Sequence, residues 1–493
     1  MKKPLAFAAL ALAATLSLAG CAAGGSTSGS GSAIEIGSLY EPQNLSNVAG
    51  GGQGVTEAFN GNVYEGLFRL TDDGDVEPLL AASDTVSEDG LTYTFTLRDG
   101  VTFHSGAKLT SADVKSSIEA VLADDSQSAR KSSFSDILSI ETPDDATVVV
   151  TLGARSISFV YNLSYVWIVG PEASETAEDG TGPYTLGDWK RGSSLSLEAF
   201  DGYWGDAPKS DEVVFDYFTD ATALSNALLT GQVDIVTSVQ SPDTLAQFSD
   251  NADFTVSDGQ STTKELLAFN DRVAPFDNVD IRKAVYSAID TEKLLNSIWG
   301  DYGTLIGSMV PPSDPWYEDL TAVNPYDPAL AKQLLASGGQ PDGFEFTLDT
   351  PTYDPHPAVA EFVKSELAKV GITVTINPIS ADEWYSKVYK AQDFTATLQE
   401  HVNDRDVVWY GNPDFYWGYD NPQVTAWVAE AEASATTDEQ TAKLKQVNEQ
   451  IAADAASVWL YLYPQIVVAS SDVSGYPVNG LNSQFFVYDI VAK

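Results

Sequence analysis

Cysteine and histidine are scarce in this chain of 493 residues, which narrows the chemistry open to it. Cys21 is the single cysteine, so the chain has no internal disulfide and no thiol-based metal site. The three histidines, His104, His356 and His401, lie far apart and lack the spacing of a histidine metal motif. No Gly-x-Ser-x-Gly sequence marks a hydrolase nucleophile. We therefore expect a protein that is not an enzyme and that carries no metal and no cofactor.

Basic residues are also few, with 26 Lys and Arg against 70 Asp and Glu, giving a formal net charge of −44. A field of this sign repels phosphate backbones, so nucleic acid is excluded as a partner. Such a charge otherwise indicates a well-solvated surface. Hydrophobic residues make up 43% and aromatic residues 11% of the chain, which suits a large folded core.

The longest N-terminal apolar run, Leu5 to Leu18, is too short to span a membrane. It follows Met1-Lys2-Lys3 and leads into Leu18-Ala19-Gly20-Cys21, an arrangement typical of a secretory signal. Residues 1–20 are therefore expected to be a signal peptide. Leu-Ala-Gly-Cys resembles the bacterial lipobox, which implies cleavage before Cys21 and lipid attachment to its sulfur. Residues 21–33 would then be a flexible linker from a lipid anchor to an exported protein.

The clearest strand and helix pattern lies between Gly180 and Val236. Alternating apolar residues predict a strand over Ser194–Phe200, and a second, more apolar strand covers Val213–Phe218. Asp220 is placed to cap a helix, after which Val233–Val236 returns to strand. The order predicts a mixed α/β fold.

Helices become more frequent after Asn270. Asp280 and Asp290 are both placed to cap helices with regular apolar stripes, and Thr437 with Gln440 has the spacing of a capping box. Ile372–Ile376 alternates as a strand between such helices. This half of the chain is again α/β.

Two turns and a strand in the first half of the chain carry a family resemblance. They are Gly-Thr-Gly-Pro-Tyr at 180–184, Tyr-Trp-Gly-Asp-Ala-Pro at 203–208 and Gly-Gln-Val-Asp-Ile at 231–235. Further motifs occur in matching order: Tyr64–Leu67, Glu77–Ala81, Gly90–Gly100, Phe103–Gly106, Pro275–Asp277 and Ile281–Val285. The whole set resembles the extracytoplasmic solute-binding proteins of family 5, the peptide/nickel class of ABC importers.

The resemblance implies an α/β, two-lobed periplasmic-binding-protein-like fold (type II, cluster C) with a hinge and an extra subdomain in the first lobe. The main sheet of lobe I would use residues 34–70, 181–268 and 470–493, and the extra subdomain would be 71–180. Lobe II would be 269–469. The chain would cross between lobes near Ala268 and Ala469, which would form the hinge.

The same resemblance implies a function without catalysis. A solute would be captured between the lobes and delivered to ABC permease subunits by a monomer held at the outer face of the bacterial cytoplasmic membrane through the lipid on Cys21. Oligopeptide is the expected solute. An oligosaccharide or another organic solute remains open, as does a nickel chelate with His401 as the tempting ligand.

Ligand contacts in the family come from three places. In this chain they correspond to the loop after the first strand, the segment before the helix at Val359, and the loop after the strand at Phe394. We therefore expect the solute to touch Tyr40, Glu41, Tyr353, His401, Asn403, Asp404, Trp409, Tyr416 and Trp417, with the aromatic rings stacking on it. Dipeptide binders of the family carry an Arg where Pro351 and Thr352 stand here. No obvious cation therefore awaits a peptide carboxylate, although Arg405 is close in sequence.

Overall fold

Strands from distant parts of the chain build the main sheet of lobe I. The computed structural model describes residues 33–50, 52–174, 176–239 and 242–493, so the expected signal peptide and Cys21 lie outside the described residues. The seven strands run in the order β12-β18-β11-β1-β10-β9-β8. Their bounds are β1 Ile34–Ser38, β8 Tyr184–Lys190, β9 Ser194–Ala199, β10 Glu212–Tyr217, β11 Ile235–Val236, β12 Phe254–Gly259 and β18 Gln465–Ser470. β1 runs parallel to β10 and β11, and the other pairs are antiparallel.

Both faces of this sheet are covered, because apolar side chains point to each side in turn. In β18, Val467 and Ala469 join the core on the side of α1 (Gly52–Phe59). Ile466 and Val468 join the core on the side of α4 (Ala221–Leu229). Short elements η2 (Pro242–Thr244) and α5 (Ala246–Ser249) follow α4.

A single buried carboxylate joins three of the family motifs in space. Glu65, which is 3% exposed, accepts hydrogen bonds from the Thr181 hydroxyl at 2.8 Å, the Tyr203 hydroxyl at 2.9 Å and the Trp204 indole at 2.9 Å. Burial raises the pKa of Glu65, and these donors oppose that rise. The motifs thus hold lobe I together.

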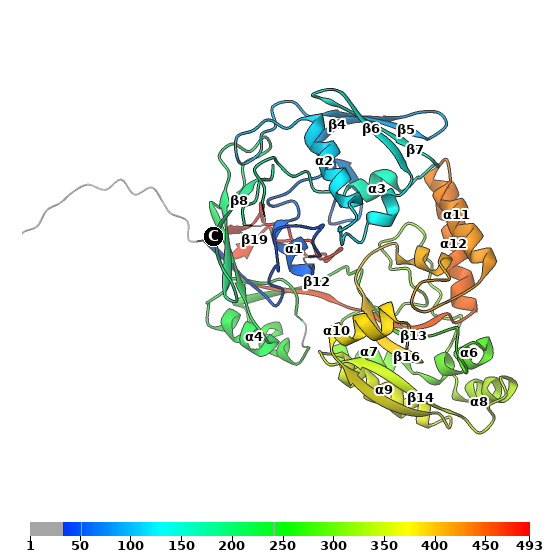
Figure 1. The fold of residues 1–493 in the computed structure, drawn as a ribbon. Helices are drawn as coiled ribbons and strands as arrows, with labels where there is room; N and C mark the ends of the chain where they lie inside the picture. The colour runs from blue at the N-terminus through cyan, green and yellow to red at the C-terminus, as the bar shows by residue number, and fades with distance from the viewer. Residues whose placement is uncertain (1–32, 51, 175, 240–241) are drawn as a thin grey trace, which may run out of the picture. The chain divides into compact units, whose positions relative to one another are not determined.

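A separate four-stranded sheet lies entirely within residues 71–180, in the order β4-β5-β7-β6 (Figure 1). Its strands are β4 Ala81–Val86, β5 Thr92–Leu97, β6 Ile137–Asp144 and β7 Thr147–Leu152. Its helices are α2 Ser111–Leu122, η1 Lys131–Phe134 and α3 Phe159–Leu163. The core of this subdomain packs β5 and β7 against α2 and α3. Two small ribbons, β2 (Phe68–Leu70) with β3 (Val76–Pro78) and β19 (Val473–Ser474) with β20 (Val491–Ala492), complete lobe I.

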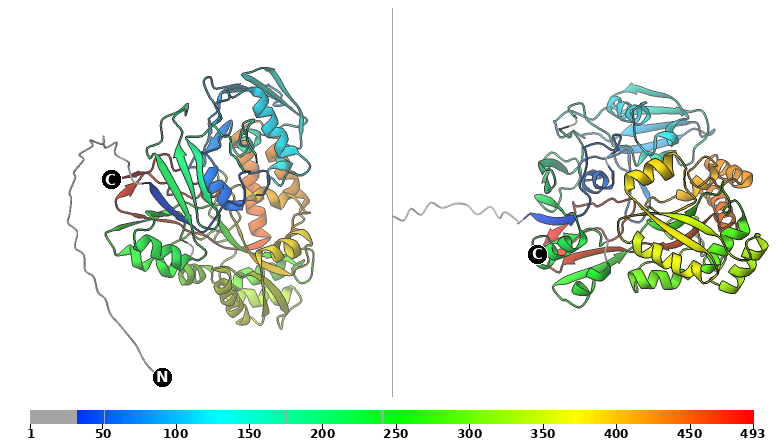
Figure 2. Two further views of the ribbon diagram at one scale, coloured as in Figure 1. Left: turned by 60° about the vertical axis from the view of Figure 1, so that its left-hand side comes forward. Right: turned by 60° about the horizontal axis from the view of Figure 1, so that its bottom comes forward.

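Lobe II has a five-stranded sheet in the order β15-β14-β16-β13-β17, with helices around it (Figures 1 and 2). The strands are β13 Lys264–Phe269, β14 Glu345–Pro351, β15 Thr373–Ile379, β16 Ala396–His401 and β17 Ser457–Leu462. The helices are α6 Val279–Ala288, α7 Thr291–Trp299, α8 Pro328–Ser337, α9 His356–Ala368, α10 Ala381–Glu383, η3 Trp384–Lys390, η4 Asp406–Gly411, α11 Pro422–Glu432 and α12 Thr437–Ala453. They enclose one large apolar core.

Both predicted crossings between the lobes were placed several residues too late. β13 already belongs to the sheet of lobe II, and β18 already belongs to the sheet of lobe I. The connecting segments are therefore 260–263 and 463–464. Ala268 and Ala469 lie inside strands, where apolar residues continue without a break. The sequence therefore shows no sign of a lobe boundary at either place. The true breaks follow Gly259 and fall at Pro464, which has no N–H to donate to a sheet.

Helix caps were predicted better than these crossings. Asp220 accepts from the Ala223 N–H at 2.8 Å and Asp290 from the Lys293 N–H at 3.0 Å, as expected. Asp280 was wrong as a cap, because Asn278 takes that position by accepting from the Asp280 N–H at 2.9 Å. Likewise the last long helix is capped by Thr436 instead of Thr437.

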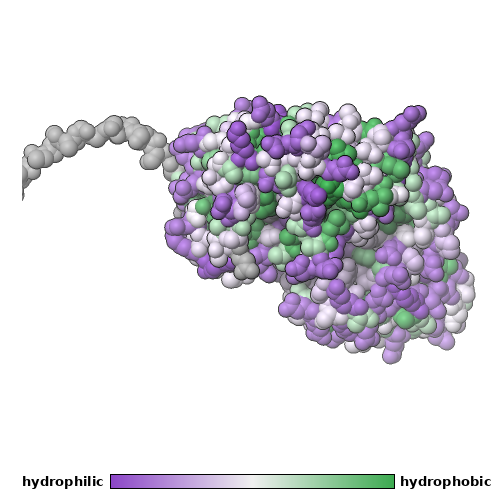
Figure 3. All heavy atoms as spheres, turned by 45° about the horizontal axis from the view of Figure 1, so that its top comes forward, coloured by the Kyte–Doolittle hydropathy of each residue, from purple (hydrophilic) through white to green (hydrophobic). Residues whose placement is uncertain are grey.

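The surface seen in Figure 3 is largely hydrophilic. In Figure 3, hydrophilic side chains cover much of the visible face, and apolar side chains gather in patches between them. No helix among the described residues has both the length and the apolar content needed to cross a membrane.

Candidate functional site

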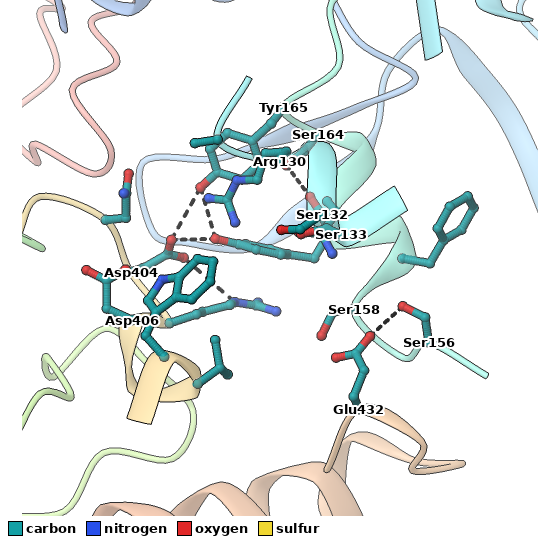
Figure 4. A pocket seen from close by; sticks show the side chains of 18 of the residues that line it. Arg130, Ser132, Ser133, Ser156, Ser158, Ser164, Tyr165, Asp404, Asp406 and Glu432 are labelled. Atoms are coloured by element: carbon teal, nitrogen blue, oxygen red, sulfur yellow. Dashed lines mark hydrogen bonds and ion pairs between the residues drawn. The ribbon is translucent and has the colours of Figure 1, made fainter. Parts of the chain in front are cut away.

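A cavity of about 540 Å³ lies between the extra subdomain and lobe II (Figure 4). One wall comes from η1, α3 and the residues around them, between Ser128 and Trp167. The opposite wall comes from residues 403–412 and from α11 and α12, and Asn482 and Gln484 close one side. This volume is typical of sites that bind small molecules.

Asp404 gathers the polar groups at one end of the cavity. Its carboxylate accepts from the Tyr161 hydroxyl and, at 3.3 Å, from the Tyr165 hydroxyl, both on the opposite wall. Arg405 lies 3.7 Å from the same carboxylate, and Asp404 N–H donates to the Asn482 side chain at 3.1 Å. Burial raises the pKa of both tyrosines, so their hydroxyls remain donors. Asp404 therefore links lobe II to the subdomain.

Two guanidinium groups alternate with aromatic rings beside Asp404. Arg130 lies 3.8 Å from the ring centroid of Tyr165, and Arg405 lies 3.5 Å from that of Tyr161. Trp316 covers Arg405 at 5.4 Å. Cations favour the faces of aromatic rings, so this stack fixes both arginines with little side-chain freedom.

A buried ion pair holds the loop that carries Asp404. Lys264 of β13 is fully buried, and its ammonium group donates to the backbone oxygen of Asn403 and to Asp406, 3.1 Å away. His401 lies 3.6 Å from Asp406 on another side. Burial alone would raise the pKa of Asp406, but Lys264 and His401 outweigh it and lower that pKa. The loop is thus fixed from the sheet beneath it.

Hydrogen bonds also join the two walls at the other end of the cavity. The Ser156 hydroxyl donates to the Glu432 carboxylate, and the Ile157 N–H donates to the Glu432 backbone oxygen at 3.0 Å. Gln440 of α12 donates to the Ser158 hydroxyl at 3.1 Å. The site therefore has the carboxylates of Asp404 and Glu432 at its two ends (Figure 4).

Three of the predicted contact residues line this cavity, namely Asn403, Asp404 and Trp409. Tyr40 instead lines a much smaller cavity of about 30 Å³, together with Glu400. Tyr353 donates to Glu400 at 3.4 Å and packs edge-on against His356. The residues predicted from the sequence thus fall at two places, the large cavity and the surroundings of Glu400.

Tyr353 and the other four predicted residues line neither cavity. Glu41 accepts from the Trp189 indole at 3.2 Å and the Gly192 N–H at 2.9 Å, which ties its loop to the β8–β9 hairpin. Tyr416 and Trp417 are 1% and 0% exposed and belong to the core of lobe II. His401 Nε2 forms a hydrogen bond of 3.0 Å with the Tyr416 hydroxyl. These rings support the site from behind, because their large apolar faces pack on one another.

Sequence reasoning missed the subdomain wall. Arg130, Tyr161 and Tyr165 line the cavity from this wall and Glu432 of α11 lines it from lobe II, yet none was singled out. Tyr161 and Tyr165 are four residues apart, a spacing that places side chains on one face of a helix. No helix was predicted for this apolar stretch, whereas α3 covers Phe159–Leu163 and ends two residues before Tyr165.

The described residues contain no group of three or more His, Cys, Asp or Glu side chains placed to hold a metal ion. His401, the residue considered for nickel, is engaged by Tyr416 and Asp406.

Comparison with known proteins gives a consistent result. Residues 75–406 match the model of bacterial extracellular solute-binding proteins, family 5. The chain is 31% identical to the glutathione-binding protein GsiB of Salmonella typhi over 352 residues, covering 68% of this chain and 67% of the relative.

Solved structures share the fold. The binding protein AgaA of A. tumefaciens R10, in complex with agropinic acid, is 25% identical, with a TM-score of 0.79 over 94% of this chain and 99% of that one. A dipeptide-binding protein of Pseudoalteromonas sp. SM9913, in complex with Met-Leu, has a TM-score of 0.79 at 20% identity over 94% of this chain and 100% of that one. With the two-lobed architecture and the interlobe cavity, these matches show that the chain belongs to the family 5 extracellular solute-binding proteins of ABC importers.

Proposed function

We propose that this protein is an exported, lipid-anchored receptor that captures an oligopeptide between its lobes and delivers it to ABC permease subunits. The observation that carries the proposal is the 540 Å³ cavity, whose walls come from both lobes. A solute in such a place contacts both walls only when they are together. It therefore favours the closed arrangement, which is the requirement for ligand-driven closure.

The lining supports a peptide as the solute. Glu432 offers a carboxylate to an amine, while Trp409 and Tyr165 offer rings to apolar side chains. Asn403 and Asn482 add amide groups suited to a peptide backbone. The relative GsiB is named for binding glutathione, which is itself a tripeptide.

The proposed mechanism involves no bond breaking. The solute settles on one wall, the chain rotates about residues 260–263 and 463–464, and the second wall closes over it. The closed form then docks on the permease as a monomer. Opening of the lobes at the membrane would release the solute.

Native mass spectrometry of the gently purified protein tests the solute class. We expect a bound mass that is released on denaturation and equals a sum of amino-acid residues. Masses in hexose increments would contradict the peptide and favour the oligosaccharide alternative. An empty protein that no short peptide stabilises in a thermal-shift panel would also contradict it.

Membrane attachment has its own test in Cys21→Ser. Lipid attachment needs the sulfur, and two or more acyl chains give a stable anchor. We expect the unaltered chain to fractionate with membranes and the serine variant to leave the membrane fraction, as judged by immunoblotting. A variant that stays with the membranes would refute the lipid anchor.

A further inference from the structure

We propose that the solute carries a carboxylate or an equivalent anionic group and that Arg130 binds it. This inference deepens the proposed solute capture and rests on it. Arg130 stands immediately before η1, on the wall contributed by the extra subdomain, and lines the cavity (Figure 4).

The charges around the cavity leave Arg130 without a carboxylate of its own. Among the described residues, Arg130 forms no ion pair, whereas Arg405 lies 3.7 Å from Asp404. Asp404 also accepts from the hydroxyls of Tyr161 and Tyr165. Its lone pairs are therefore largely engaged. The charge of Asp404 acts on Arg130 and Tyr161 hydrogen-bonds to it, but no carboxylate of the described residues lies in ion-pair contact with its guanidinium.

The geometry of Arg130 suits an incoming anion. Its guanidinium carbon lies 3.8 Å from the centroid of the Tyr165 ring and 5.4 Å from that of the Tyr161 ring. Stacking leaves the edge of a guanidinium for hydrogen bonds, and the N–H groups that do not bond to Tyr161 can donate in a fork that matches a carboxylate. The side chain is half-buried, so these bonds would form in a place partly shielded from water.

The two other arginines of the cavity are committed elsewhere. Arg155 donates to the backbone oxygen of Glu88 at 3.1 Å, on the β4–β5 hairpin. Arg405 is held between Tyr161 and Trp316 and pairs with Asp404. Pro351 and Thr352 stand where dipeptide binders of the family carry an Arg, so those positions offer no cation to a carboxylate. Arg130 offers one from the opposite lobe.

The test compares the free acid of a short peptide with its C-terminal amide. Trialanine and trialanine amide are titrated calorimetrically into the unaltered protein, Arg130→Gln and Arg191→Gln, with glutathione as a probe that has two carboxylates. Arg191 is a matched control, because it also stacks on a ring, that of Trp189 at 3.5 Å, but on the β8–β9 hairpin and outside the cavity.

We expect the unaltered protein and Arg191→Gln to bind the acid about ten-fold or more tighter than the amide, as for sites built around a charged group. Arg130→Gln should bind acid and amide equally while keeping the affinity for the amide. Equal binding of both forms by the unaltered protein, or an undiminished preference in Arg130→Gln, would overturn the inference. If the unaltered protein binds neither the acid nor the amide, glucuronate and glucose are titrated as a second pair. The inference then survives only if the unaltered protein binds glucuronate and Arg130→Gln loses that binding.

This outcome is separable from failure of solute capture itself. A neutral solute found by mass spectrometry would refute the role of Arg130 and leave the importer function intact. A protein that carries no solute and responds to no probe would contradict both.

Discussion

Replacing Asp404 with alanine should weaken solute binding by about two orders of magnitude, roughly 2.7 kcal/mol. The substitution removes the acceptor of the Tyr161 and Tyr165 hydroxyls and the counter-ion of Arg405. Truncating one partner of a buried, hydrogen-bonded charge pair typically costs 2 to 5 kcal/mol, because the other charge is left unpaired. The closed arrangement bears this cost, since the tyrosines and Asp404 belong to opposite walls. Isothermal titration with the co-purified solute measures it.

Asp136→Ala is the matched control for Asp404. Asp136 also lines the cavity, but it is exposed and belongs to the subdomain alone. Its removal should change affinity by less than about two-fold, as expected for a solvated carboxylate. Circular dichroism should show both variants folded. Solute affinity that survives in Asp404→Ala would show that this carboxylate does not organise the site.

Lys264→Met should lower the free energy of unfolding by about 3 to 5 kcal/mol near neutral pH, because it leaves Asp406 buried without its cation. Lys264 has a fully buried side chain, and Asp406 is 3% exposed. Methionine matches the lysine stem in length, so little packing is lost and the unpaired carboxylate dominates the effect. Urea unfolding followed by tryptophan fluorescence measures it.

The pH dependence of this effect has a definite sign. The pKa of Asp406 is lowered in the folded protein, so its contribution is present above the ordinary aspartate pKa and is lost as the pH falls through the lowered value. The difference between Lys264→Met and the unaltered protein should therefore shrink in acid.

Lys364→Met serves as the surface control for the lysine substitution. Lys364 pairs with Glu361 at 3.5 Å, but its side chain is 45% exposed. Exposed pairs contribute about 0 to 1 kcal/mol, so this variant should unfold almost like the unaltered protein. Equal losses in both variants would mean that the buried pair has no special role.

The fold was largely predictable because its signals are local. Turn motifs, capping residues such as Asp220 and Asp290, and alternating strands each depend on a few neighbouring residues. The crossings between the lobes were harder to predict, since Ala268 and Ala469 lie in apolar strands. An apolar strand has the same residue pattern whether it belongs to lobe I or to lobe II. Only sheet pairing, which joins residues far apart in the chain, decides to which lobe a strand belongs.

The site was half predictable for a related reason. Asn403, Asp404 and Trp409 were found from their position in a family loop, and they do line the cavity. Trp417 follows in the same aromatic stretch, yet it is fully buried, and sequence does not distinguish a ring that packs on a solute from one that packs on its neighbours. Arg130 was missed because its loop meets Asp404 only through the tertiary fold.

The position of β18 in the main sheet has a consequence for how the chain is made. Its neighbours β11 and β12 end at Val236 and Gly259, whereas β18 begins only at Gln465. β12 pairs with β18 alone in that sheet, so it stays detached until all of lobe II has been synthesised. Pairings of such sequence separation form slowly. A newly made chain therefore remains without its finished main sheet through most of translation.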